Sequence, residues 1–230
     1  FDASEINGFM NIGESDLLLK PDPSTAEILP WRPQQDRVLR IFCDICYPDG
    51  RTFEGDSRNI LKRSVDCLKE LGYSCDIGSE CKFYLFELDE YGNPTNKPHD
   101  NGTYYDVAPV DKGENIRREI CLTLEEMGIQ PESSYHQAGP GQHEIVFKYG
   151  APVEAADHLM TFKNLVKTIA HMNGLFASFM PKPLQRQNGN GIFVNLSLYD
   201  MDGNSVIDYN NETGSQFMAG ILNHIKEITL

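Results

Sequence analysis

A strand-like run carries two charged side chains whose spacing could serve a bound ion or ligand. Glu80 and Lys82 are two residues apart in the run 78–86. Side chains of a strand point alternately to opposite faces, so Glu80, Lys82 and Tyr84 should share one face, with the residues between them on the other. Charges on an interior strand are costly unless a partner or a site uses them. A solvated strand face is the alternative interpretation.

A second polar group flanks a Gly-Pro-Gly sequence. His136 and Gln137 precede residues 139–141, and His143 and Glu144 follow them. The turn should bring two strand ends together, and clustered His and Glu side chains are typical of metal or acid–base sites. A hydrogen-bonded loop histidine fits the same pattern.

A glycine-rich turn precedes another strand-like run. Asn188 and Gly189 begin the sequence Asn-Gly-Asn-Gly, directly before residues 192–199. Glycine lets a ligand approach the backbone closely. The spacing matches neither a dinucleotide-binding fingerprint nor a P-loop, so an ordinary hairpin loop is the alternative.

Apolar periodicity and helix caps predict the elements that position these residues. The expected helices cover residues 57–71, 114–127 and 152–172 and a stretch from about Gly214. The expected strands cover residues 38–47, 74–88, 129–135, 142–149, 176–180 and 192–199. Strands that occur in pairs favour an antiparallel α+β sheet. Residues 1–36, rich in glycine and proline, are expected to be loop and edge structure.

The overall charge limits the partners. The formal net charge is −14, which repels nucleic acid and anionic lipid and suits divalent cations. No apolar run reaches the roughly 18 residues of a membrane helix. The sequence has no signal peptide and starts at Phe1 rather than Met, and an apolar helical pattern runs to Leu230, so both ends are expected to be truncated.

Six cysteines are present, and two of them form a CxxC. Cys43 and Cys46 lie inside a predicted strand, and no second CxxC follows. A zinc site needs about four ligands, and a redox CxxC usually opens a helix. We therefore expect buried, reduced thiols and a cytoplasmic protein.

The polar segments, taken in order, resemble glutamine synthetase of the bacterial type. Family-like stretches occur at residues 1–9, 30–33, 53–56, 108–111, 140–145 and 180–183. The resemblance implies an α+β fold with an antiparallel curved sheet flanked by helices. It also implies that residues 1–36 are the end of an N-terminal region with linker loops. Residues 37–230 would then be a catalytic domain, incomplete at its C-terminus.

The family's reaction ligates ammonia to glutamate at the expense of ATP. ATP phosphorylates the side-chain carboxylate, ammonia displaces the phosphate, and two divalent cations, Mg or Mn, stabilise the charge that develops. The resemblance therefore implies glutamate, ammonium and ATP as substrates. It also implies a homo-oligomer of two stacked hexameric rings, with active sites shared between neighbouring subunits.

The family's metal ligands are only partly kept. The resemblance makes Glu80 and Glu144 metal ligands, with Glu144 also catalytic, whereas Lys82, Gln137 and Phe193 stand where other ligands are expected. Lys82, neutral Gln137 and Glu144 sum to zero charge without an ion. We therefore expect the Lys82 ammonium to occupy the vacated metal position and to pair with Glu144 or Glu80.

The remaining family positions are better matched. The resemblance places Glu132, Ser197 and Asn195 at the nucleotide pocket. It places Asn188 and Gly189 at the glutamate site. Asp2 matches a catalytic loop aspartate that helps to bind ammonium across a subunit interface.

Three interpretations follow. The first is a metal-depleted glutamine synthetase homologue with little or no ligase activity and a regulatory or structural role. The second is an active ligase for ammonia, or for another amine that accepts the γ-glutamyl group, with a remodelled metal site. The third is a module that binds an amino acid or a nucleotide without chemistry.

Overall fold

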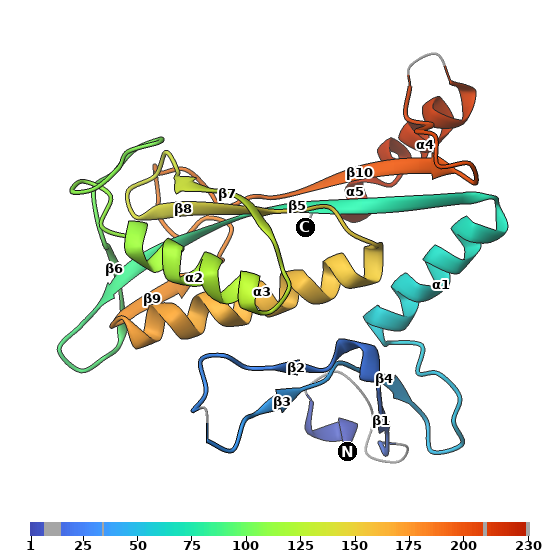
Figure 1. The fold of residues 1–230 in the computed structure, drawn as a ribbon, viewed down its shortest axis with the longest axis horizontal. Coiled ribbons are helices and arrows are strands. Elements are labelled where there is room, and N and C mark those ends of the chain that lie inside the picture. Colours follow the sequence, from blue (N-terminus) through green and yellow to red (C-terminus); the bar gives the residue numbers. More distant parts are fainter. Residues whose placement is uncertain (7–14, 34, 209–210, 229–230) are drawn as a thin grey trace.

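The computed structural model describes residues 1–6, 15–33, 35–208 and 211–228, which form a small N-terminal unit beside a larger body with one long sheet (Figure 1). The family-like stretch 1–9 therefore lies partly outside the described residues, and the expected end of the last helix at Leu230 lies wholly outside them. No helix in the described part of the chain has the length and apolar character to cross a membrane.

Short elements build the N-terminal unit. They are the 3-10 turns η1 (Ala3–Glu5) and η3 (Pro23–Thr25) and the strands β1 (Leu18–Pro21), β2 (Glu27–Ile28), β3 (Leu39–Arg40) and β4 (Cys43–Cys46). β1 pairs with β4, and β2 pairs with β3, both antiparallel. The predicted single strand 38–47 is wrong. The chain changes partner between β3 and β4, where the N–H of Phe42 donates to Thr25 Oγ1 at 2.9 Å.

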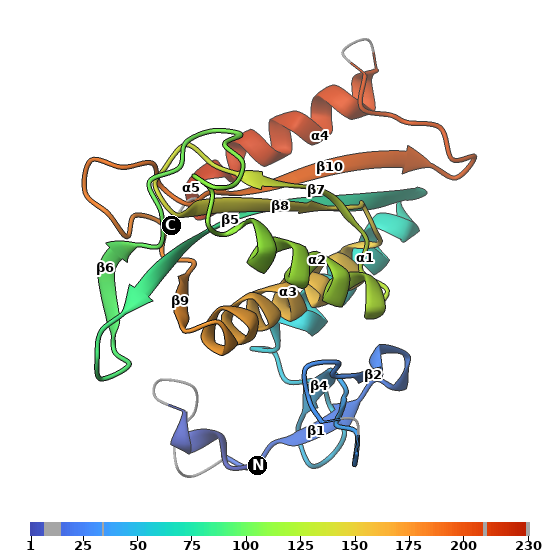
Figure 2. The same cartoon turned by 60° about the vertical axis from the view of Figure 1, so that its left-hand side comes forward.

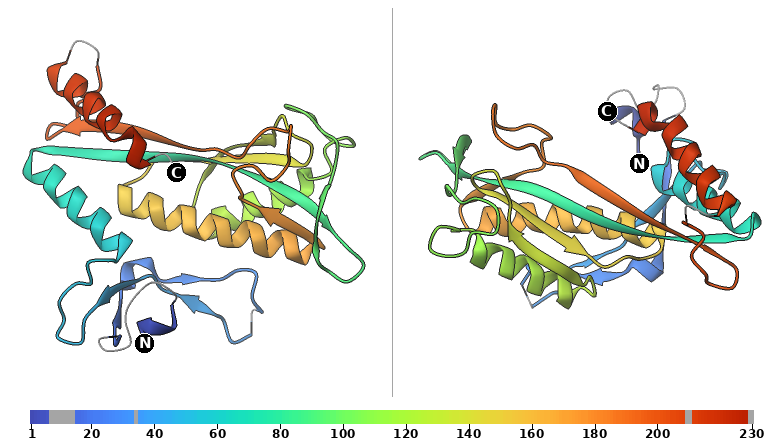
Figure 3. Two further views of the ribbon diagram at one scale, coloured as in Figure 1. Left: turned by 180° about the vertical axis from the view of Figure 1, so that it is seen from behind. Right: turned by 90° about the horizontal axis from the view of Figure 1, so that it is seen from above.

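One antiparallel sheet dominates the body. Its central strand β5 (Tyr73–Leu88) pairs with four others, and β7 extends the sheet beyond β8. These strands are β6 (Pro94–Pro98), β7 (Pro131–His136), β8 (Gln142–Phe147), β9 (Leu175–Ser178) and β10 (Ile192–Asp200). The sheet curls along its length (Figure 3), so the predicted antiparallel curved sheet with flanking helices is confirmed.

Two helices cover one face of this sheet. α2 (Glu114–Glu126) and α3 (Pro152–Met172) pack against it, whereas α4 (Glu212–Asn223) lies on the opposite side, followed by α5 (Ile225–Ile228) (Figure 2). The largest apolar core lies between sheet and helices and includes Phe83, Leu85, Ile120, Leu124, Phe162 and Leu165.

Local sequence signals explain the helix bounds. α1 (Ser57–Glu70) begins where the Asp56 side chain accepts the N–H of Arg58 at 3.1 Å. Glycines at positive φ follow α1, α2 and α3, which is the backbone conformation that ends helices: Gly72, Gly128 and Gly174. The helices predicted at 57–71, 114–127 and 152–172 are confirmed to within a residue.

A charged cluster joins the N-terminal unit to the body. The guanidinium of Arg58 on α1 contacts Asp22 and Asp44 of the N-terminal unit and Asp157 on α3, at 2.8, 2.7 and 2.9 Å. The six cysteines are free thiols. Only Cys81 is buried and Cys67 is exposed, so the expectation that all are buried is wrong.

Candidate active site

Strand register brings the predicted site residues to the open face of the sheet. Lys82 of β5 lies directly opposite Glu144 of β8, and Glu80 lies opposite Phe193 of β10. Side chains of directly paired residues project to the same side of a sheet. Because Phe83 belongs to the helix-side core, these four side chains lie on the other face, as alternation predicts.

Glu144 is held by two hydrogen bonds to one of its oxygens. Its Oε2 accepts from the Tyr135 hydroxyl at 2.7 Å and from the Gln137 amide nitrogen at 2.5 Å. The Gln137 amide oxygen accepts from the N–H of Ala138 at 2.9 Å, which turns the NH2 group toward Glu144. Glu144 Oε1 is buried and has no hydrogen-bond partner among the residues that the structure describes. One lone carboxylate oxygen therefore remains for a ligand.

Tyr135 is a site residue that sequence analysis missed. Burial, and then the hydrogen bond to Glu144, raise the pKa of its phenol, which keeps it a donor. The Tyr105 ring stacks on it with centroids 4.6 Å apart and planes 6° apart, and the Tyr104 ring stands perpendicular to both. Two-residue alternation with Gln137 along one face was the only signal in the sequence.

Lys82 does not form the ion pair predicted for it. Its Nζ lies 4.8 Å from the centroid of the Phe193 ring, and among described side chains it forms no salt bridge with a carboxylate. Glu80 Oε1 instead accepts from Asn195 Nδ2 at 2.9 Å. The predicted pairing with Glu80 or Glu144 is therefore wrong. The ammonium instead lies over the ring of Phe193, in a cation–π contact.

The other predicted residues lie at different distances from this face. The turn with Asn188 and Gly189 is exposed and adjoins it, because the hydroxyl of Tyr84 donates to the Asn188 carbonyl at 2.6 Å. Ser197 is two residues beyond Asn195 on β10, and therefore on the same side. Glu132 is exposed, where the register of β7 with β8 shifts.

Asp2 is remote from these residues within one chain. Its Oδ1 accepts from the N–H and the hydroxyl of Ser4 at 2.9 and 2.7 Å, which caps η1. The N-terminal end of the chain lies in the small unit, on the helix side of the sheet (Figure 1). A role for Asp2 at this face would therefore require a second subunit.

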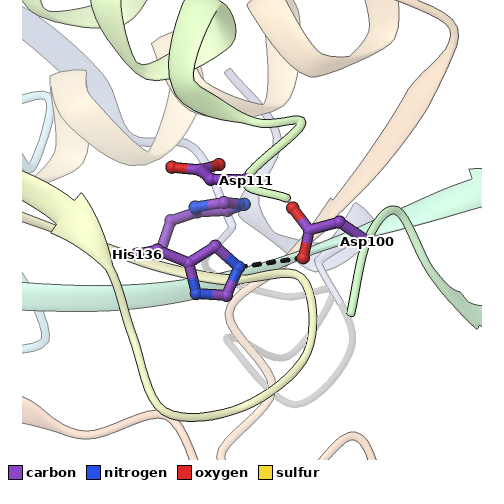
Figure 4. A group of neighbouring side chains, drawn as sticks. Asp100, Asp111 and His136 are labelled. Carbon is purple, nitrogen blue, oxygen red and sulfur yellow. Dashed lines mark hydrogen bonds and ion pairs between the residues drawn. The ribbon is translucent and has the colours of Figure 1, made fainter. Parts of the chain in front are cut away.

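The histidines of the Gly-Pro-Gly segment face the other way, into a buried cluster. One ligand atom each from Asp100, Asp111, His136 and His143 lies within 4.8 Å of the others. Figure 4 labels three of them, Asp100, Asp111 and His136. Sequence analysis did not identify the two aspartates. The guanidinium of Arg117 reaches into this cluster, where its Nη1 lies 2.7 Å from Asp111 Oδ2 and 2.9 Å from His143 Nδ1.

Hydrogen-bond geometry indicates the protonation of the two histidines. His136 Nδ1 lies 2.7 Å from the Gln137 carbonyl and Nε2 lies 2.8 Å from Asp100 Oδ1, so both nitrogens donate. Burial lowers the pKa of His136, but its hydrogen bonds with Asp100 and the Gln137 carbonyl, together with the charges of Asp100 and Asp111, outweigh burial and the pKa is raised. Burial, followed by the charge of Arg117, holds the pKa of His143 well below its ordinary value.

The cluster is therefore balanced by the protein's own cations. Two carboxylates face one imidazolium and one guanidinium, whereas neutral His143 accepts from Arg117. A metal ion would have to displace that guanidinium. Asp100 Oδ1 also accepts the N–H of Gly141 at 2.8 Å, so the cluster fixes the turn that carries Gln137.

Comparison with known proteins identifies the family. Residues 54–230 match the family model for the glutamine synthetase catalytic domain, and residues 1–48 match the glutamine synthetase beta-Grasp domain. The chain belongs to the glutamine synthetase family. It is 50% identical over 231 residues to the glutamine synthetase of Clostridium saccharobutylicum, a match that covers 98% of this chain and 52% of that protein.

Further members of the glutamine synthetase family agree. The Staphylococcus aureus glutamine synthetase is 47% identical over 235 residues, which cover 100% of this chain and 53% of that protein. The chain thus spans about half the length of these curated relatives. The Plasmodium falciparum glutamine synthetase structure superposes with a TM-score of 0.86 at 29% identity, over 98% of this chain and 50% of that one.

The family implies divalent cations at the open face, and the side chains present do not fit a pair of them. Mg²⁺ and Mn²⁺ prefer carboxylate oxygens. Lys82 offers an ammonium, Phe193 offers a ring, and Gln137 directs its N–H toward Glu144 rather than an oxygen toward an ion. Of the positions that the resemblance predicts as metal ligands, only 80 and 144 carry carboxylates.

Proposed function

We propose that this chain is the catalytic-type part of a metal-depleted glutamine synthetase homologue, which performs the family's ligation of ammonia to glutamate weakly or not at all. The observation that carries the proposal is the environment of Glu144. Gln137 and Tyr135 donate hydrogen bonds to its Oε2, and Lys82 lies on the same sheet face.

Charge supports the same proposal. With the family's residues, the first metal position would hold three carboxylates and a dication, for a net charge of −1. Lys82, Gln137 and Glu144 sum to zero without any ion. A dication would therefore add two positive charges to the face that carries this ammonium, and the mutual repulsion of the like charges opposes its binding.

The other ligand assignments belong to the same proposal. Glutamate would bind at Asn188 and Gly189. ATP would bind at Glu132, Ser197 and Asn195, and Asp2 would assist ammonium from a neighbouring subunit. That last role needs a homo-oligomer of the double-ring type, because the N-terminal end of the chain lies in the small unit, away from β8, the strand that carries Glu144 (Figure 1). Cytoplasmic localisation is part of the proposal.

The domain division is also a proposal. A boundary between residues 36 and 37 stays a prediction. Pairing of β2 with β3 and of β1 with β4 joins residues on both sides of it, and the two family matches leave residues 49–53 between them. These observations favour a boundary near residues 49–53.

Restoring the ligands tests the proposal. The variant Lys82→Glu, Gln137→Glu, Phe193→His, made in the intact protein, should bind Mn²⁺ much more tightly than the wild type, as measured by titration calorimetry and electron paramagnetic resonance. A matched control with the same charge change on exposed residues is Lys69→Glu, Gln216→Glu, Tyr91→His. The proposal fails if wild-type protein binds two Mn²⁺ ions per chain, or if the restored variant binds no better than the control.

One observation favours an alternative. Within the described part of the chain, buried Glu144 Oε1 has no hydrogen-bond partner, which leaves an acceptor for one cation or one amine. The alternative is an active ligase for ammonia or for another amine that accepts the γ-glutamyl group, with a remodelled one-metal site. Phosphate release that depends on glutamate, an amine and ATP, measured with and without Mg²⁺, separates the two: turnover at rates normal for a ligase supports the alternative.

A further inference from the structure

Two buried side chains connect the exposed turn 188–190 to the sheet. The hydroxyl of Tyr84 on β5 donates to the carbonyl of Asn188 at 2.6 Å. The amide of Gln142 at the start of β8 donates to the carbonyl of Gly189 at 3.0 Å and lies 3.0 Å from Asn190 Oδ1. Tyr84 is fully buried and Gln142 is 1% exposed, although the turn that they hold lies at the surface.

Gln142 also holds the other loop of the site. Its Oε1 accepts the N–H of Gly139 at 3.1 Å, and its backbone carbonyl accepts the N–H of Gln137 at 2.7 Å. A Cβ added to Gly139 would lie 2.2 Å from the Tyr84 hydroxyl, so this loop packs directly against Tyr84. The same two side chains thus contact both the 137–141 loop and the 188–190 turn.

The turn has little freedom of its own once these bonds form. The N–H of Asn190 donates to the Pro181 carbonyl at 2.8 Å, and its side-chain amide donates to the carbonyls of Ser178 and Met180 at 3.1 and 3.0 Å. A Cβ on Gly189 would lie 2.8 Å from the Pro181 carbonyl oxygen, so only glycine fits there. Its conformation is therefore set by partners on β5, β8 and β9.

We propose that Tyr84 and Gln142 are positioning residues that lock the 188–190 turn and couple it to the loop that carries Gln137. The inference rests on the proposed function, in which the turn holds the amino-acid ligand and Gln137 faces Glu144. A carboxylate-bearing amino acid held at the turn is then presented in a fixed relation to Glu144. Neither side chain touches the ligand.

A core role alone would not require these contacts. Tyr84 already stacks on Phe86, with centroids 5.6 Å apart and planes 12° apart, and a phenylalanine would keep that packing. Its hydroxyl instead ends on a backbone carbonyl of a surface turn 104 residues away in the sequence. The amide oxygen of Gln142 bonds to the 137–141 loop, and its amide nitrogen bonds to the 188–190 turn.

Amide hydrogen exchange tests the coupling without any ligand. The N–H of Asn190 reports on the turn, and the N–H of Gly139 reports on the other loop. In Tyr84→Phe, exchange at Asn190 should rise about tenfold, the effect of one net hydrogen bond. In Gln142→Met, both reporters should exchange faster.

Two further variants sharpen the test. Gln142→Glu keeps an acceptor for Gly139 and sets a carboxylate against the Gly189 carbonyl, so only the Asn190 reporter should accelerate. Thr161→Val removes a buried hydrogen bond inside α3, from the Thr161 hydroxyl to the Asp157 carbonyl at 2.8 Å, and should leave both reporters unchanged. Unchanged exchange at Asn190 in both Tyr84→Phe and Gln142→Met would overturn the inference.

A second experiment measures ligand binding. L-Glutamate is titrated into the intact protein in the presence of EDTA, which removes metal ions. Tyr84→Phe should weaken its affinity about tenfold, whereas Thr161→Val should not. Faster exchange with unchanged glutamate affinity would refute the positioning role. If the wild type binds no glutamate, the ligand assignment at the turn fails with the positioning role, and exchange still decides the coupling. Two bound Mn²⁺ ions would refute only the metal-depleted function.

Discussion

The buried guanidinium of Arg117 offers a test in which burial alone decides the size of the effect. Arg117→Met removes the cation that lies 2.7 Å from Asp111 Oδ2, while the methionine keeps much of the apolar stem. The two side chains are 7% and 0% exposed. Asp111 would keep the N–H of Gly113, at 2.9 Å from its other oxygen, as its remaining partner. A carboxylate left unpaired in the interior is the expected result.

The magnitude follows from that burial. Removing one partner of a buried pair costs about 3–5 kcal/mol, a large share of the roughly 5–15 kcal/mol that stabilises a typical domain. The control is Arg51→Met, which removes a guanidinium at the same 2.7 Å from Asp49, but with side chains 70% and 55% exposed. That change should have little measurable effect, because water screens exposed pairs.

Urea denaturation followed by circular dichroism measures both variants. The double variant Arg117→Met, Asp111→Asn should recover part of the lost free energy of unfolding, because it removes the unpaired charge. Equal losses in the buried and exposed single variants would refute the argument that burial of this pair makes it essential.

Four further predictions concern stability and protonation. Gly113→Ala should lower the free energy of unfolding by about 1–3 kcal/mol, because its Cβ would lie 2.5 Å from a buried imidazole. Gly220→Ala in α4, with open space around it, should raise that free energy by up to about 1 kcal/mol in urea melts. Burial raises the pKa of Asp100, but its hydrogen bonds with His136 and with the N–H groups of Gly102 and Gly141 together outweigh burial, and the pKa is lowered. The contribution of Asp100 to stability is therefore complete above about pH 4 and is lost as the pH falls. Asp100→Asn should flatten the fall of stability with pH in that range. Ser24→Ala should raise the pKa of Asp22 above about 2 in an NMR titration, because the Ser24 hydroxyl is the main cause of its depression.

For each of these predictions, a specific result would contradict the reasoning. Equal effects of the two glycine variants would show that the close approach at Gly113 relaxes freely. An unchanged acid limb in Asp100→Asn would assign the acid loss to other carboxylates. An unmoved pKa of Asp22 in Ser24→Ala would leave the guanidinium of Arg58 as its main cause.

Sequence signals located the elements well where a local residue sets the boundary. Pro152 can start a helix because its missing N–H is not needed there, and Gly174 ends it, so α3 has the predicted bounds. The strand predicted at 38–47 failed, because apolar alternation does not tell which strand a segment pairs with. Its two halves pair with different strands.

The site was predictable only where the local strand pattern sets the direction of a side chain. Alternation placed Lys82 on the face that also holds Glu144, since a strand fixes direction residue by residue. The contact of Lys82 with Phe193 was not predictable, because the neighbours within reach of a long side chain depend on how the strands pair in the folded sheet. The cluster of Asp100 with His136 was missed, since the two come from a loop and a strand 36 residues apart.

The sixteen residues of β5 have a consequence for how such a protein can change its chemistry. Positions 80 and 82 are set by the backbone ladder with β8 and β10, which does not depend on the side chains it displays. A carboxylate at one of these positions can therefore be replaced by an ammonium without a change of fold. A few substitutions on this strand could therefore remove or restore catalytic activity during evolution, while the fold stays the same.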